Sequence, residues 1–474
     1  MTEMLNVDIC VIGAGSAGLS VAAGAAQMGA STVLIEKHKM GGDCLNTGCV
    51  PSKALLAAAH AAHAMKQAAD FGVHAGDPRV ESSEVYDHIR NTIATIEPND
   101  SIERFEGLGV QVIQGEGRFA GPNKVVAGDT AITARRVVIA TGSRAFVPPI
   151  PGLDSVAYHT NETIFDATRL PEHLVIIGGG PIGIELAQAH QHLGSKVTVL
   201  ELFSVMPKDD PELVAVVRHQ LETDGVNVIE GVKINAVEAT ASGIRVNLER
   251  NGETRTIDGS DLLIAAGRVA NVDGLELEKA GIRYSSKGID VDPRLRTSNK
   301  KTFAIGDVAG GFQFTHVAGY HAGIVIKNAL FRLPAKADHS TVPWVTFTTP
   351  ELAQIGLTEE QARKAHGEIR ILRWPFHEND RAQAERKTDG LIKVITTPKG
   401  EILGCGIVGP AAGELIQTWV LAMTQNLKIG DVAQMIAPYP TLGEISKRAA
   451  GSFYTPSLFS ERTRKIVRFL SWFG

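Results

Sequence analysis

Two parts of the chain repeat one order of apolar and glycine-rich positions. Residues 7–12 are a short apolar run, which predicts a buried parallel strand, and the glycine-rich residues 13–18 follow directly. An alanine-rich stretch then predicts a helix, and a second apolar run at residues 32–35 ends on Glu36. Strand, glycine turn, helix, strand and acid in this order are typical of a βαβ unit that binds a dinucleotide.

The same order returns about 165 residues further along the chain. An apolar run at residues 174–177 leads into the glycine-rich residues 178–183 and a helical segment, and the strand predicted at residues 197–200 ends on Glu201. One glycine pattern alone is a weak indication. Two of them, each with a strand before, a helix after and an acid about 20 residues on, favour two dinucleotide sites over tight turns that bind no nucleotide.

The C-terminal part of the chain has a different pattern. From about residue 343, strand-like runs such as residues 369–372 and 391–395 alternate with helical segments, without a glycine fingerprint. This pattern predicts a separate α+β domain. The proline-rich residues 148–152 are a candidate linker, and a length of 474 residues suggests about three domains.

Composition narrows the class of protein. Hydrophobic residues make up 44% of the chain and charged residues 21%, as in ordinary globular enzymes, and a net charge of −5 argues against a nucleic-acid partner. The sequence contains no run of about 18 apolar residues, so no membrane-spanning helix is expected. Residues 1–4 lack the basic start of a secretory signal. We therefore expect a cytoplasmic protein, and its four cysteines are too few for a structural disulfide framework.

The glycines of both units are expected to let the backbone approach a pyrophosphate at a helix N-terminus. The acids that end the second strands, Glu36 and Glu201, would then accept hydrogen bonds from ribose hydroxyls. A carboxylate at 201 repels a 2′-phosphate, which favours NADH, with NADPH as the alternative. The glycines concerned are Gly13, Gly15 and Gly18 in the first unit and Gly178, Gly180 and Gly183 in the second.

Cys44 and Cys49 form a close pair of cysteines, and residues 46–48 between them can bend the chain. Pro51 suits the first turn of a helix, so Cys49 is expected at a helix N-terminus, where partial positive charge lowers a thiol pKa. Lys53 adds a full positive charge on the same face. We interpret the pair as a reversible disulfide. Two unconnected thiols or half of a zinc site are the alternatives, but no further ligands occur at zinc-binding spacing, so no metal ligand is predicted.

Residues 41–53, GGDCLNTGCVPSK, resemble the redox-active segment of the class I pyridine nucleotide-disulfide oxidoreductases, which include dihydrolipoyl dehydrogenase, glutathione reductase and mercuric reductase. The likeness extends from residue 5 to about residue 455. Further segments that agree are residues 140–143, 178–185, 265–268, 304–307 and 347–351.

The resemblance implies an α/β fold with two Rossmann-like domains and a C-terminal α+β dimerisation domain, in a homodimer that uses FAD and NADH. The FAD-binding domain would comprise residues 1–150 and 272–340, and the NAD(P)-binding domain residues 151–271. The dimerisation domain would span residues 341–455, and residues 456–474 would form a basic amphipathic tail.

The resemblance also implies roles for single residues. Cys49 would face the flavin as the charge-transfer thiolate, and Cys44 would exchange with substrate. Lys53 and Glu185 would pair beside the flavin, and Asp307 would bind its ribitol. The other cofactor-binding positions implied are Gly42, Thr141, Gly142, Gly267, Arg268 and Gly306.

Residues 437–444, APYPTLGE, depart from the disulfide-reducing members of the family. Those carry a histidine as acid–base, followed five residues later by a glutamate; here Glu444 is present, but Tyr439 replaces the histidine. A phenol with a pKa near ~10 cannot shuttle protons as a histidine does near neutral pH. Tyrosine at this position resembles mercuric reductase, although no cysteine follows Cys405 to form that family's C-terminal pair.

We therefore expect a flavin-dependent reductase of a metal ion or another small electrophile, with dihydrolipoyl dehydrogenase or a related disulfide reductase as the alternative. A redox-silent partner subunit that keeps FAD only for structure is the second alternative. An intact Cys44–Cys49 pair argues against that last reading, because a silent subunit has no physical need for both thiols.

The tail after Tyr454 reads TPSLFSERTRKIVRFLSWFG. If it is helical, its apolar residues repeat at i, i+3, i+4 and i+7, which is typical of a membrane-surface or partner-docking helix. Packing on the chain's own dimer is the equal alternative. The apolar positions are Ile466, Phe469, Leu470 and Phe473, and the cations are Arg462, Arg464, Lys465 and Arg468.

The acid at residue 201 gives a first prediction. NADH should exceed NADPH in kcat/KM by about tenfold or more, because Glu201 repels the 2′-phosphate. Steady-state assays with both nucleotides measure the ratio, and Glu201→Gln should narrow it. A clear preference for NADPH would contradict the assignment.

Overall fold

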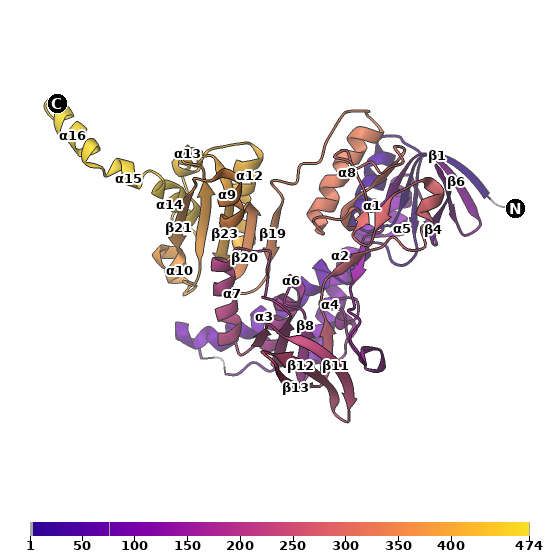
Figure 1. Cartoon of the computed structure of the whole chain (residues 1–474), viewed down its shortest axis with the longest axis horizontal. Helices are drawn as coiled ribbons and strands as arrows, with labels where there is room; N and C mark the ends of the chain where they lie inside the picture. Colours follow the sequence, from indigo (N-terminus) through magenta and orange to yellow (C-terminus); the bar gives the residue numbers. More distant parts are fainter. Residues whose placement is uncertain (1–2, 75, 474) are drawn as a thin grey trace. The chain divides into compact units, whose positions relative to one another are not determined.

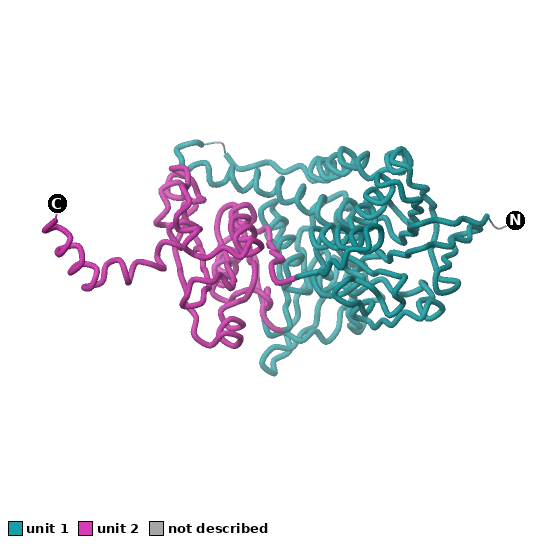
Figure 2. Tube along the Cα trace, turned by 90° about the horizontal axis from the view of Figure 1, so that it is seen from above, with its two compact units in different colours: residues 1–202, 229–338 teal, residues 203–228, 339–474 magenta. Residues whose placement is uncertain are grey.

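The computed structural model describes residues 3–74 and 76–473. The chain divides into two compact units, which Figure 2 shows in two colours. Unit 1 comprises residues 1–202 and 229–338, and unit 2 comprises residues 203–228 and 339–474. Residues 203–228, which follow the second glycine motif in the chain, therefore belong to the same unit as the C-terminal residues.

The first glycine motif lies on a seven-stranded sheet in unit 1, of order β3-β2-β1-β6-β5-β4, with β18 beside β6 (Figure 1). The central strand β1 pairs in parallel with β2 and with β6. The strands are β1 (Glu3–Ile12), β2 (Thr32–Glu36), β3 (Val110–Gln114), β4 (Gly117–Gly121), β5 (Lys124–Ala127), β6 (Thr130–Ile139) and β18 (Thr302–Ala304).

Alternate residues of β1 enter two different cores, because successive side chains of a strand point to opposite faces. Ile9 and Val11 pack in one core with helices α1 (Ser16–Gln27) and α8 (Thr315–Ala329). Cys10 and Ile12 pack in the other, so Cys10 is a buried core residue. Burial on both faces explains why the last four residues of this strand, 9–12, are all apolar.

The second glycine motif lies on a parallel sheet of order β10-β9-β8-β14, and a three-stranded antiparallel sheet β11-β12-β13 packs beside it in a shared core. Strands β7 and β15 pair antiparallel, as do β16 and β17. The strands are β7 (Ser143–Ala145), β8 (His173–Ile177), β9 (Lys196–Glu201), β10 (Asn227–Glu230), β11 (Lys233–Thr240), β12 (Gly243–Arg250), β13 (Glu253–Gly259), β14 (Asp261–Ile264), β15 (Arg268–Ala270), β16 (Tyr284–Ser285) and β17 (Gly288–Ile289).

Helix α3 packs on two other helices of unit 1. Helix α3 contacts both α4 and α6, and α6 is the helix that follows the second motif. The cysteine pair lies where the short helix α2 leads into α3. The helices are α2 (Gly42–Asn46), α3 (Cys49–Gln67), α4 (Ser82–Ile96), α5 (Ile102–Gly107) and α6 (Pro181–His192).

Unit 2 contains a five-stranded antiparallel sheet of order β19-β20-β23-β22-β21 (Figure 1). Its core includes Phe376, Cys405 and Trp419, so Cys405 is buried as well. The strands are β19 (Pro343–Thr346), β20 (Glu351–Gly356), β21 (Arg370–Pro375), β22 (Leu391–Thr396) and β23 (Ile402–Gly409). The helices are α7 (Pro211–Thr223), α9 (Glu359–His366), α10 (Asp380–Ala384), α11 (Ala412–Leu415), α12 (Gln417–Thr424), α13 (Ile429–Gln434), α14 (Glu444–Ser452), α15 (Thr455–Leu458) and α16 (Glu461–Leu470).

The fold class predicted from the sequence is confirmed: two parallel βαβ units with glycine turns, followed by an α+β domain. Among the residues that the structure describes, no helix is both long enough and apolar enough to cross a bilayer.

A buried ionic cluster holds α7 against the sheet of unit 2. The Lys393 side chain on β22 is only 5% exposed, and its Nζ lies 2.9, 2.8 and 2.9 Å from carboxylates of Asp210, Glu212 and Glu359. The guanidinium of Arg373 forms a bidentate ion pair with the carboxylate of Glu212. The Arg373 hydrogen bond, with help from Lys393, lowers the pKa of Glu212 to about 2. The cluster thus needs its cation, since three carboxylates converge on it.

Replacing this cation should destabilise unit 2. Lys393→Met leaves the carboxylates without their shared partner and should cost about 3 kcal/mol of unfolding free energy at neutral pH. In the native chain, the stabilisation from Glu212 is full above its ordinary pKa and is lost as pH falls toward 2. The deficit of the variant should therefore shrink in acid, as its unpaired carboxylates take up protons.

Urea unfolding followed by circular dichroism across pH measures this deficit. The exposed Lys399→Met is the matched control and should change little. Equal stability of both variants at neutral pH would show that the cluster contributes nothing.

Candidate active site

The cysteine pair is shaped by a short bend between two helices. Helix α3 begins at Cys49, as the sequence predicted, and α2 contains Cys44. The amide of Asn46 ties the bend to the backbone by donating to the carbonyl oxygens of Met40 (3.0 Å) and Gly42 (2.9 Å). Both cysteines are thiols in this structure, Cys44 half-buried and Cys49 exposed.

The two thiols have very different acidities. A hydrogen bond between them lowers the pKa of Cys49 to about 6 and raises that of Cys44 well above its ordinary value. Thr315, at the start of α8, supports the Cys49 thiolate across 3.3 Å between Oγ1 and Sγ, and the charge of Lys53 favours it further. At neutral pH the pair therefore holds one proton on Cys44 and a thiolate on Cys49.

Lys53 joins α3, which begins at Cys49, to α6, the helix that follows the second glycine motif. Its Nζ lies 2.7 Å from Oε2 of Glu185, which belongs to α6 and has a side chain only 8% exposed. The structure thus brings together two residues 132 positions apart that the family resemblance had paired. Because Glu185 is buried, the ion pair fixes the position of the Lys53 charge relative to Cys49.

Asp43 is a central residue of the bend that sequence reasoning missed. Its Oδ1 accepts hydrogen bonds from Thr47 (2.7 Å) and Asn161 (3.1 Å), and its Oδ2 pairs with Arg268 at 3.1 Å. The negative charge of Asp43 opposes ionisation of Cys49. Arg268, which pairs with Asp43, partly offsets that negative charge. The only signal in the sequence was an acid directly before Cys44.

Arg268 also reaches the acid that the resemblance assigned to the flavin ribitol. Asp307 accepts a hydrogen bond from Ser143 Oγ at 2.5 Å, and Arg268 Nε donates to the same hydroxyl at 2.8 Å. Burial raises the pKa of Asp307, while Ser143 and Arg268 oppose that rise. Nearby, Thr141, just before β7, and Asn271, just after β15, each donate a side-chain hydrogen bond to the other's backbone carbonyl, at 2.7 and 3.0 Å.

The two glycine motifs have the same geometry. Gly13 and Gly178 adopt φ of +103° and +118°, which favours glycine. A Cβ on Gly18 would lie 1.8 Å from the carbonyl oxygen of Gly13, and a Cβ on Gly183 would lie 2.1 Å from that of Gly178. Each motif therefore needs its first glycine for the turn and its third for close packing of helix on strand.

The middle glycines fit a bound pyrophosphate. Gly15 and Gly180 are the N-caps of α1 and α6, and neither helix has an acid in its first turn. No described heavy atom lies within 4 Å of a Cβ built on Gly180, and at Gly15 the nearest is Cα of Gly42, at 3.9 Å. Open space before an unopposed helix N-terminus suits an anionic group of a dinucleotide.

The two acids at the strand ends hold these turns. Oε2 of Glu36 accepts from the amide of Ala14 at 2.6 Å, and Oε2 of Glu201 accepts from the amide of Gly179 at the same distance. Oε1 of Glu36 also accepts from the amide of His38 at 2.8 Å. Both carboxylates thus shape the loop that approaches the nucleotide, a role that sequence reasoning had not assigned.

Tyr439 and Glu444 belong to unit 2. Tyr439 is 71% exposed, and its hydroxyl donates to Oδ2 of Asp380 at 3.0 Å. This hydrogen bond to a carboxylate raises the pKa of the phenol, and Glu444, at the start of α14, contributes in the same direction. Tyr439 is therefore a hydrogen-bond donor at neutral pH and not a proton acceptor.

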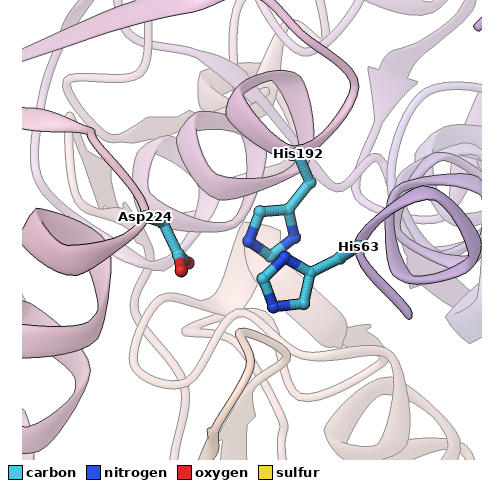
Figure 3. A group of neighbouring side chains, drawn as sticks. All are labelled: His63, His192 and Asp224. Carbon is cyan, nitrogen blue, oxygen red and sulfur yellow. The ribbon is translucent and has the colours of Figure 1, made fainter. Parts of the chain in front are cut away.

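The histidines of unit 1 lie in different environments. His60 and His74 are exposed, but His63 is half-buried, and its ring stacks on that of buried His192 with 3.9 Å between the centroids (Figure 3). His321 accepts from the amide of Gly306 through Nδ1, at 3.2 Å. That contact fixes the turn which carries Asp307.

Comparisons with known proteins agree with this geometry. A family model described as pyridine nucleotide-disulphide oxidoreductase matches residues 7–322, and the dimerisation-domain model of the same family matches residues 342–450. The chain is 35% identical over 451 residues to a mercuric reductase of Bacillus cereus, which covers 94% of this chain and 72% of the relative.

Other similar proteins are named for different activities. A dihydrolipoyl dehydrogenase of Geobacillus stearothermophilus is 35% identical over 460 residues, covering 94% of this chain and 96% of the relative. Among solved structures, the Cu(II) complex of the HOCl-induced flavoprotein disulfide reductase RclA from Escherichia coli superposes with a TM-score of 0.84 at 27% identity, over 94% of this chain and 99% of that chain.

The acidity of Cys49 can be tested through its main cause. In the reduced holoenzyme, the alkylation rate of Cys49 by iodoacetamide should rise with pH through a midpoint of about 6, since only the thiolate reacts. Cys44→Ala removes the hydrogen-bond donor and should move the midpoint toward the ordinary thiol value of ~8.5. Cys44→Ser retains a donor and should lie between the two.

Mass spectrometry of the alkylated peptide measures these rates at each pH. Cys405→Ala, a buried thiol of unit 2, serves as the control and should leave the midpoint unchanged. A midpoint near 6 in Cys44→Ala would contradict the proposed cause.

Proposed function

The chain belongs to the pyridine nucleotide-disulphide oxidoreductases, and from this membership we propose that it reduces a soft metal ion or another small electrophile through Cys44 and Cys49. The family uses FAD and NAD(P)H, and its activities act on disulfides or metal ions. The observation that carries the proposal is the combination of an acidic Cys49 thiol with a Tyr439 phenol of raised pKa.

The two cofactors have candidate positions in unit 1. The loop and helix at Gly15 would hold the pyrophosphate of FAD, with Asp307 toward the ribitol, and the loop at Gly180 would hold that of NADH. When bound, FAD supplies the two-electron relay between the nicotinamide and the disulfide. We retain the assignment of residues 1–150 and 272–340 to FAD, 151–271 to NAD(P) and 341–455 to dimerisation.

The residues of the chain then divide the chemistry between them. Two electrons and one proton convert the Cys44–Cys49 disulfide into the Cys44 thiol and the Cys49 thiolate. A soft divalent ion that binds Cys44 displaces its proton into solvent, and the ion is then held by two thiolates, which are the ligands it prefers. Transfer of two electrons to that ion re-forms the disulfide. Arg268 and Lys53 balance the negative charge that accumulates around the pair.

Tyr439 favours this electrophile over a disulfide. When the dithiol reduces a disulfide substrate, a base must remove and return a proton near neutral pH. The hydrogen bond from Tyr439 to Asp380 raises the phenol's pKa, so the phenol is unsuited to that work. A metal ion needs thiolate ligands and no such proton shuttle.

Dihydrolipoyl dehydrogenase activity is the second candidate. Relatives with that name match this chain over nearly its full length, and Cys44 would attack a disulfide sulfur to form a mixed disulfide and release a thiolate. We further propose a homodimer in the cytoplasm, in which Tyr439 of one subunit serves the dithiol of the other.

Parallel assays of NADH oxidation test this ranking. With mercuric ion as acceptor, turnover should exceed that with lipoamide or glutathione disulfide, and Cys44→Ala should abolish both. Tyr439→His should raise the kcat for lipoamide by about tenfold or more, because it supplies a base that titrates near neutral pH.

Tyr439→Phe is the matched control, since it removes the hydroxyl without supplying a base. Efficient lipoamide turnover by the native enzyme would overturn the preference for an electrophile. An equal response to His and Phe at this position would show that proton transfer is not what limits disulfide reduction.

A further inference from the structure

The last helix of the chain exposes apolar and basic side chains together. None of the described residues 461–470 of α16 is buried within unit 2. The four apolar side chains of the helix are between 49% and 60% exposed, and Trp472 and Phe473 beyond its end are 83% and 74% exposed. The four are Ile466, Val467, Phe469 and Leu470.

The apolar side chains of α16 gather on one face, and the cations lie around that face and opposite to it. Ile466, Phe469 and Leu470 follow helical spacing and share one face, and the ring of Phe473 contacts that of Phe469 edge-on at 5.2 Å. By the same spacing, Arg464 and Arg468 lie on the opposite side, Lys465 flanks the apolar face, and Arg462 lies one turn before Ile466 on that face. This division is typical of a helix that rests at a boundary between water and an apolar phase.

A helix of this length needs a covering surface. It has ten residues and a cap in which Ser460 Oγ accepts from the amide of Thr463 at 3.3 Å. Isolated helices shorter than about 12–15 residues are marginal in water. Some surface must therefore accept the apolar face if the helix is to persist.

We propose that α16 docks the protein on an anionic lipid bilayer, with its apolar face in the headgroup layer. Four cations against one acid in α16 match phosphate headgroups, and exposed Trp472 and Phe473 suit the interfacial layer. The whole chain carries a net charge of −5, so the same surface attracts the helix and repels the remainder. This opposition would orient the enzyme with its tail toward the lipid.

A second copy of the chain accounts less well for these features. The match to the family's dimerisation model ends at residue 450, so the tail, with α15 and α16, lies outside the segment that the family shares for dimerisation. A protein groove could accept the apolar face, but it would not explain the four cations that the same helix carries. The inference does not depend on which electron acceptor the enzyme uses.

Vesicle flotation with the full-length, FAD-loaded protein tests the proposal. Binding to an equal-part mixture of phosphatidylcholine and phosphatidylglycerol should exceed binding to phosphatidylcholine alone and should fall with added salt. Each cation of α16 replaced by glutamine should weaken binding about fivefold. Ile466→Ser with Leu470→Ser should abolish binding while NADH oxidation is unchanged.

The matched control neutralises four exposed cations of unit 1 and should still float. Equal binding to both vesicles, or binding to neither, would overturn the proposal, as would a tail variant that dissociates the dimer in analytical ultracentrifugation, since the tail would then belong to the second copy. The control substitutions are Arg79→Gln, Arg255→Gln, Lys279→Gln and Arg283→Gln, at positions between 57% and 89% exposed.

Discussion

The hydrogen bond between the Cys44 and Cys49 thiols is the interaction on which the rest of the site depends. It makes one proton serve two sulfur atoms, and so it separates the acidities of two chemically identical groups. Every other contact around the pair either supports that separation or moderates it. Thr315 and Lys53 stabilise the thiolate, burial and Asp43 oppose it, and Arg268 limits the effect of Asp43.

This balance explains why residues from distant parts of the sequence meet around one short bend. The thiolate needs positive charge nearby, but an isolated cation would be free to move away. Glu185 therefore holds Lys53, and Asp43 together with Ser143 holds Arg268. Both cations near the bend are themselves fixed by a carboxylate or a backbone oxygen, so the charges around the dithiol are set before any substrate arrives.

Local patterns in the sequence were sufficient for the fold class and for much of the site. The glycine turns, the start of α3 at Cys49 and the paired strands follow from periodicity and from short-range backbone chemistry. Contacts between distant residues were not predictable in this way. Thr315 lies 266 positions from Cys49, and Asn161 lies 118 positions from Asp43, so no local pattern relates them. The ionic cluster around Lys393 likewise joins strands and helices far apart in the chain, and it brings α7 into unit 2.

The carboxylates at the two strand ends have a consequence for how this enzyme could change its nucleotide during evolution. Glu201 is predicted to bind a ribose, and its carboxylate also holds the amide of Gly179, just as Glu36 holds that of Ala14. Exchange of Glu201 for a residue that tolerates a 2′-phosphate would therefore also release the loop before the second helix. A lineage that altered its cofactor would have to replace the support of this loop in the same series of substitutions. If Glu201 selects the nucleotide as predicted, then selectivity and the support of this loop are inherited together at one position.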